Sequence, residues 1–143
     1  MRSACACALS LLAACSAPAL ERVRLPDLDR AVFEREVQPI LASQCANPTC
    51  HGRPERPLSL FAPGRFRRVP EELHLPGPLT PEELDHNYRA SVALAADPAP
   101  GDDALLARKP LAGGGLYHGG GAVFDGPTDR SYRTLRAWME TGR

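Results

Sequence analysis

The chain has 143 residues, and its 17 basic residues balance 17 acidic ones. This balance argues against nucleic-acid binding, which usually needs a strong basic excess. The 15 prolines and 12 glycines argue against long regular sheets and indicate helices joined by many loops. One domain with a thin core of its own is expected for this length, and we expect the basic cluster Arg65-Phe66-Arg67-Arg68 to be a solvated surface segment.

The N-terminus has the pattern of an export signal. Arg2 precedes a short apolar run that is typical of a secretory signal and too short for a stable membrane anchor. The run ends Leu12-Ala13-Ala14-Cys15, which resembles the bacterial lipobox, where cleavage precedes the cysteine and the cysteine carries lipid. We therefore expect a signal peptide over residues 1–14, lipidation of Cys15 and a lipid-anchored tether over residues 15–28. An ordinary signal peptide with incidental cysteines is the alternative.

The first helical pattern runs from about Asp29 to Gln44, with one apolar stripe made by Phe33, Val37, Ile40 and Leu41. Pro39 should kink or restart this helix. The proline-rich span 52–78 predicts a structured loop. Its length favours a loop that wraps around a functional site over one that only connects two helices.

A second helix is predicted from Thr80, which can cap it, to a point before Pro98. Its expected inner face is Leu84, Tyr88, Val92 and Ala95. Asp102 or Asp103 can then cap a short helix that carries Leu105 and Leu106 and ends near Pro110.

A last helix should begin near Thr128 and Asp129 and stop at Gly142. Its expected buried stripe is Tyr132, Leu135, Trp138 and Met139. We expect this helix to cross the first one, with Phe33, Val37, Leu135 and Trp138 near the contact.

The segment Cys45-Ala-Asn-Pro-Thr-Cys50-His51 brings two thiols and an imidazole together. Covalent haem attachment needs this order, because two thiols form thioethers with the haem vinyl groups and the adjacent histidine binds the iron. The usual spacing is C-x-x-C-H, whereas four residues separate the cysteines here. Asn47-Pro48-Thr49 is turn-prone and could form the outward bulge that the wider spacing requires.

Two other interpretations of this segment stay open. Cys45 and Cys50 could form a small structural disulfide, with His51 a bystander, as is common in exported proteins. Alternatively, the two cysteines, His51 and another histidine could bind zinc, although the neighbouring side chains of Cys50 and His51 diverge and suit one tetrahedral ion poorly.

The order of motifs resembles the small c-type cytochrome domains of bacterial envelope lipoproteins. Val37-Gln38-Pro39-Ile40-Leu41 leads into the cysteine pair, Pro100-Gly101-Asp102 precedes Leu105-Leu106, and Leu135-Arg136-Ala137-Trp138 closes the chain before Gly142. The likeness spans about residues 31–142. It implies a mostly α, small cytochrome c-like helical domain over residues 29–143, with long loops around one covalently attached haem c. Cys45 and Cys50 would then be the attachment points and His51 the proximal iron ligand.

Many relatives in that group place a methionine in the loop before the last helix as the distal ligand, and this chain has none there. His118 lies between the glycine triplets 113–115 and 119–121, which would let the backbone approach the haem closely. We therefore expect His118 to be the distal iron ligand, with His74 and His86 as exposed reserves. A vacant sixth position, open to small ligands, is the alternative.

The resemblance implies electron transfer, not enzymatic activity, on the periplasmic side of the bacterial cell envelope. The partners would be an unidentified redox partner protein and, through the lipid anchor, the membrane, with the outer membrane as one candidate. The main alternative is a haem-free, disulfide-stapled lipoprotein that acts as an interaction module. A haem enzyme acting on peroxide is a third hypothesis, which would need a distal base and open iron.

Overall fold

The computed structural model describes residues 24–96 and 104–142. The predicted signal peptide, Cys15, most of the tether and the cap at Asp102 or Asp103 lie outside these ranges. The described residues are mostly helical, as predicted, and contain no strand, only an isolated bridge between Leu111 and Phe124. The helices are α1 (Arg30–Val32), η1 (Phe33–Val37), α2 (Gln38–Ile40), η2 (Leu41–Cys45), η3 (Pro70–Glu72), α3 (Pro81–Ala95), α4 (Leu105–Arg108) and α5 (Arg130–Met139).

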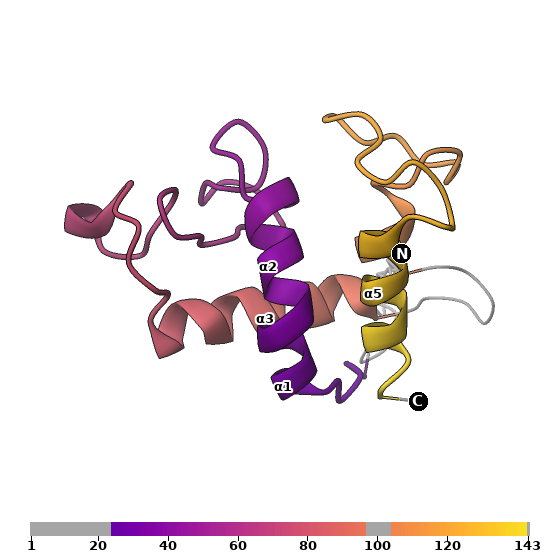
Figure 1. Cartoon of the computed structure of the whole chain (residues 1–143), viewed down its shortest axis with the longest axis horizontal. Helices are drawn as coiled ribbons and strands as arrows, with labels where there is room; N and C mark the ends of the chain where they lie inside the picture. The colour runs from indigo at the N-terminus through magenta and orange to yellow at the C-terminus, as the bar shows by residue number, and fades with distance from the viewer. Residues whose placement is uncertain (1–23, 97–103, 143) are drawn as a thin grey trace, which may run out of the picture.

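The first four of these elements form one continuous helix from Arg30 to Cys45 (Figure 1). Asp29 caps its start by accepting the Val32 N–H at 2.9 Å. In η1 the Gln38 N–H bonds the Phe33 carbonyl, five residues earlier, so this turn is wider than a regular one. Pro39 follows directly and has no N–H to donate. The regular hydrogen-bond ladder is interrupted here, but the helix continues without a break to Cys45, so the predicted restart at Pro39 does not occur.

The other predicted helices also form close to their expected limits. Thr80 and Glu83 make a reciprocal capping box at the start of α3, with Glu83 N–H donating to the Thr80 hydroxyl and Thr80 N–H to the Glu83 carboxylate. Asp129 caps α5 by accepting the Tyr132 N–H at 3.0 Å. α4 is the short helix expected before Pro110.

The core lies between the first helix, α3 and α5, and α3 runs across the direction of the other two (Figure 1). Phe33 is fully buried, with its ring centroid 5.3 Å from that of Trp138 and 5.4 Å from that of Tyr88. The Trp138 indole N–H donates to the Asp29 carbonyl at 2.9 Å, so a side chain of α5 also provides a hydrogen bond to the backbone at the start of the first helix. Val37 and Leu135 are fully buried in the same cluster. The predicted contact of the first and last helices through these residues is confirmed, and Met139 is a core residue.

The buried face of α3 differs from the predicted apolar stripe. Val92 and Ala95 are buried, but Leu84 and Tyr88 are only partly so. The residues of α3 that are completely buried are polar, namely Glu83, Asn87 and Ser91. Because they are spaced four residues apart, they lie along one face of the helix.

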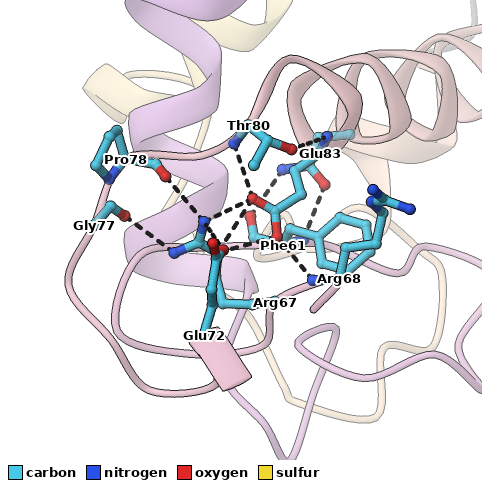
Figure 2. A network of polar contacts seen from close by, with 9 residues as sticks. Phe61, Arg67, Arg68, Glu72, Gly77, Pro78, Thr80 and Glu83 are labelled. Carbon is cyan, nitrogen blue, oxygen red and sulfur yellow. Dashed lines mark hydrogen bonds and ion pairs between the residues drawn. The ribbon is translucent and has the colours of Figure 1, made fainter. Parts of the chain in front are cut away.

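The expectation that the basic cluster 65–68 is a solvated surface segment is wrong for Arg67. Its side chain is only 2% exposed, and its guanidinium pairs with the carboxylate of Glu83 at 2.9 Å and with Glu72 at 2.8 Å (Figure 2). It also donates to the carbonyls of Gly77 and Pro78. The physical reason is that a guanidinium can be buried when its donors are paired.

Asn87 anchors the same loop at a second point. Its amide accepts the Phe61 N–H at 2.9 Å and donates to the Phe61 carbonyl at 2.8 Å, and a further donor bond reaches Gln38. The polar face of α3 therefore fixes the long loop that was predicted over residues 52–78 and connects it to the first helix.

The predicted tether boundary at residue 28 also needs adjustment. Leu28 is 3% exposed and belongs to the core cluster. A side chain at Gly142 would meet the Asp27 carbonyl at 2.7 Å, so the end of the chain packs closely against this segment. The last residue of the predicted tether is thus part of the folded domain.

Candidate functional site

The two cysteines lie at the ends of a tight loop that follows η2. The Asn47 side chain accepts the Thr49 N–H at 2.9 Å, and the Asn47 carbonyl accepts the N–H groups of Cys50 and Gly52. This is the turn that the sequence predicted. Gly52 is required for its closure, because a Cβ there would lie 2.3 Å from the Ala46 carbonyl oxygen.

Both thiols are free, and both line one cavity. Burial, with a smaller contribution from the nearby Cys50, raises the pKa of the Cys45 thiol to about 11. Cys45 is therefore a neutral thiol at neutral pH. Its attack on any electrophile would need the proton to be removed first.

His51 is half-buried and has a fixed orientation. Its Nδ1 lies 2.8 Å from the Leu58 carbonyl oxygen, and because a carbonyl can only accept, the proton must be on Nδ1. In the neutral ring Nε2 then carries a free lone pair. Burial is the largest cause and lowers the pKa of His51, although the hydrogen bond to the Leu58 carbonyl acts in the opposite direction. The lowered pKa favours the neutral imidazole that a metal ligand must be.

His118 has the same arrangement on the glycine-rich loop. Its Nδ1 is 2.6 Å from the Gly121 carbonyl oxygen, and the Gly121 N–H bonds back to the His118 carbonyl at 2.9 Å. Gly121 has a φ of +75°, which a residue with a side chain rarely adopts, so the turn depends on glycine at this point. His118 therefore also leaves Nε2 free for a ligand bond.

The two imidazoles are nearly parallel, 13° apart, and their ring centroids are separated by 6.0 Å. Metal–imidazole bonds are about 2 Å long, so one ion between two such rings separates the bonded nitrogens by about 4 Å and the centroids by somewhat more. The centroid spacing is of the size that joint ligation of one ion needs, but the rings are stacked, and stacked rings direct their in-plane Nε2 lone pairs alongside each other. Both imidazoles could therefore bind one ion only after a ring turns. His51 comes from the loop after η2 and His118 from the loop after α4, and both loops extend to the same end of the molecule (Figure 1).

The cavity that contains these four side chains has a volume of about 330 Å³. Most of its walls are apolar, with leucines from the first helix, α3 and α4 and from the loop after His51. Its size lies at the lower end of the range for ligand pockets, and its partly open shape suits a flat ligand with one exposed edge. The leucine walls, the paired thiols and the imidazoles fit a covalently bound haem.

The reserve histidines do not reach this cavity. His74 is exposed on the loop before α3, and His86 lies on α3 with its Nε2 3.0 Å from the Ser59 carbonyl oxygen and its ring against Phe61. Their predicted exposure is confirmed.

Two cations that the sequence analysis did not single out, Arg56 and Lys109, also line the cavity. Arg56 closely follows His51, and Lys109 precedes the buried Pro110 at the end of α4, so neither position has a sequence pattern that marks it as functional.

Within the described residues, no group of three or more histidine, cysteine or acidic side chains is arranged to hold a metal ion by itself. Over the same residues, no helix has the length and apolar character needed to cross a bilayer. Comparison of the chain with protein-family models, curated proteins and solved structures finds no match.

Proposed function

We propose that the chain is an electron-transfer lipoprotein of the bacterial cell envelope that carries one covalent haem c. The observation that supports this most strongly is the convergence of four side chains on one apolar cavity. Cys45 and Cys50 lie at the two ends of a single loop, while His51 and His118 come from two loops and stack on each other, each with its Nδ1 on a carbonyl and its Nε2 free. Haem attachment through two thioethers with two imidazole ligands requires this combination.

Each residue then has a defined role. Cys45 and Cys50 hold the group through thioethers, with His51 as proximal and His118 as distal ligand. A bound haem c supplies reversible one-electron exchange. The leucine walls give the site a mainly apolar lining. The hydrogen bonds from His51 to Leu58 and from His118 to Gly121 orient the rings and fix their tautomers.

If His51 and His118 both held the iron, no coordination position would remain open for peroxide, so the group would serve electron transfer and not peroxide chemistry. The redox partner is a protein that remains to be identified, and the membrane contact is made through lipid on Cys15.

The test is to express the full chain in a host with c-type maturation machinery and to record a pyridine haemochrome spectrum after denaturation. We expect a c-type spectrum that persists in denaturant, and its loss in the Cys45→Ser, Cys50→Ser double variant. A colourless product whose mass is two hydrogens below that of the reduced chain would show a disulfide instead, and would favour the haem-free interaction module.

The role of His118 has its own test. His118→Ala should change the visible spectrum of the ferric protein from low-spin to high-spin, while His74→Ala, an exposed histidine outside the cavity, should leave it unchanged. An unchanged spectrum for His118→Ala would show that His118 is no ligand and would reopen the vacant sixth position.

A further inference from the structure

The glycine-rich loop after α4 is closed at its base. The Ala112 N–H donates to the Phe124 carbonyl at 2.8 Å, and the Val123 N–H donates to the Pro110 carbonyl at 2.8 Å. Phe124 is fully buried in the core. The loop therefore enters and leaves the domain at one fixed place, and any movement of its histidine must arise between these two bonds.

Arg108 fixes the first part of this loop. It is the last residue of α4, and its Nε donates to the Gly114 carbonyl at 2.9 Å. A Cβ at Gly114 would lie 2.2 Å from the Arg108 carbonyl oxygen, and a Cβ at Gly115 would lie 3.8 Å from Nη2 of the same arginine. The Gly114 N–H also donates to the Leu111 carbonyl at 3.0 Å. The chain up to Gly115 is therefore packed closely against the end of α4.

Beyond Gly115 the loop is held differently. Among the described residues, the hydrogen bonds of segment 116–122 are those of the turn in which His118 and Gly121 bond each other. Gly115 precedes this segment with a φ of +73°, and Gly121 lies near its end with a φ of +75°. Glycine adopts such backbone conformations without strain, so the two glycines suit a segment that turns as a unit.

One of the two stacked imidazoles must turn before both can bind one ion, and their surroundings identify which. His51 is half-buried, and its backbone is fixed by bonds from its N–H to the Cys45 carbonyl and from the Leu60 N–H to its own carbonyl. Its ring is fixed by the Leu58 carbonyl. The His118 ring is bonded inside its own turn, so it can move together with that turn without losing this hydrogen bond. His118 is therefore the ring that moves.

We propose that Arg108 is a positioning residue for the distal ligand. It holds the loop up to Gly115 in place, so that only residues 116–122 turn when His118 leaves the stack for the iron. A shorter moving segment loses less conformational entropy when its ligand binds, so the contact between Arg108 and Gly114 strengthens the bond from His118 to the iron. This inference rests on the proposed function, because it takes His118 to be an iron ligand.

Competition with an external ligand measures how firmly His118 is held. The full chain is made with covalent haem, and the ferric protein is titrated with cyanide, which binds the iron only where His118 has left it. The apparent dissociation constant, read from the absorbance spectrum, therefore falls as the bond from His118 weakens. The variants are Arg108→Met, which keeps an apolar stem and removes the donor, His118→Ala, and both together. Arg133→Met is the matched control, because Arg133 is an exposed arginine of α5 outside the cavity.

Arg108→Met should bind cyanide roughly tenfold more tightly than the unmodified chain, as expected when a charge-assisted hydrogen bond that supports the competing ligand is lost. Arg133→Met should bind cyanide as the unmodified chain does. His118→Ala should bind it at least as tightly as Arg108→Met, and the double variant should match His118→Ala, because the effect of Arg108 passes through His118. A role of Arg108 in general stability would not give this match.

An unchanged cyanide affinity in Arg108→Met would overturn the inference and leave the proposed function in place. A tenfold effect of Arg108→Met that persists in the His118→Ala background would do the same. A colourless unmodified chain would reject both, because His118 would have no iron to bind.

If Arg108→Met does not fold, hydrogen exchange of the unmodified, haem-loaded chain provides the second measurement. Saturating cyanide should accelerate exchange over residues 116–122 and leave the N–H groups of Ala112 and Gly114 protected, because their bonds lie on the fixed side of Gly115. Equal acceleration at Gly114 would overturn the inference.

Discussion

Replacement of Glu83 by glutamine should destabilise the fold strongly, although the side chain lies outside the cavity. Glu83 is fully buried, and its carboxylate accepts from the Arg67 guanidinium at 2.9 and 3.0 Å and from the backbone N–H of Arg68 at 2.7 Å (Figure 2). The Thr80 N–H also donates to this carboxylate at 2.9 Å. A glutamine side chain has one acceptor oxygen and one NH2 group, so some of these donors would meet the NH2 group instead of an oxygen. Arg67 would then remain buried without its main counter-charge.

The loss of one partner from a buried ion pair costs about 3–5 kcal/mol. For a domain of this size we therefore expect the midpoint of thermal unfolding to fall by roughly 10–20 °C. Glu82→Gln is the matched control, because it is the same substitution on the neighbouring, exposed residue of α3.

Urea unfolding followed by circular dichroism measures the difference at pH 7. Glu83→Gln should lower the midpoint strongly and Glu82→Gln should hardly change it. Equal midpoints for the two variants would refute the argument that the Arg67–Glu83 ion pair holds the long loop in place. If Glu83→Gln does not fold, the double variant with Arg67→Met provides the second measurement, since removal of both charges should restore part of the stability.

The pH dependence follows from the same network. Burial alone would raise the pKa of Glu83, but the hydrogen bonds from Arg67 and from the backbone N–H groups of Arg68 and Thr80 outweigh burial and lower it. A carboxylate with a lowered folded pKa contributes stability that is complete above its unfolded pKa, roughly 4.3, and is lost as the pH falls through the folded pKa. The advantage of the unmodified chain over Glu83→Gln should therefore shrink below about pH 4. A constant difference down to the acid transition would contradict this.

Three further predictions concern the loops around the cavity. Asn87→Ala removes three hydrogen bonds and leaves the Phe61 backbone groups unpaired, so it should cost about 2–3 kcal/mol in urea unfolding, whereas the exposed Arg89→Ala should have little effect. Gly52→Ala would place a methyl group 2.3 Å from the Ala46 oxygen and should lower the yield of covalent haem in haemochrome assays; Gly126→Ala, with open space around it, should not. His118→Met should raise the reduction potential measured by redox titration, because thioether ligation favours the reduced iron; an unchanged potential would argue against ligation from position 118.

Local sequence rules explain why the helices were predictable. Asp29, Thr80 and Asp129 each cap a helix, and the hydrogen bonds involved span only three residues, so the sequence alone specifies them. The contact of the first and last helices was also predictable, because Phe33 and Trp138 belong to apolar stripes that can be buried only against another element.

The polar face of α3 could not be predicted in this way. Glu83, Asn87 and Arg67 are residues that usually remain in water. Their burial depends on partners that lie 15 to 49 positions away in the sequence, so no local pattern indicates it.

The same division applies to the candidate site. The sequence by itself determined the chemistry of the cysteine segment, the turn at Asn47 and the glycine-flanked position of His118. Only the tertiary structure decided that His118 stacks on His51 in the cavity that the two cysteines line, and that His74 and His86 lie elsewhere. The physical reason is that the chemical type of a ligand is a property of a single residue, whereas the convergence of several ligands depends on how α3, α4 and the long loops pack. The same packing also brings Arg56 and Lys109 to the cavity.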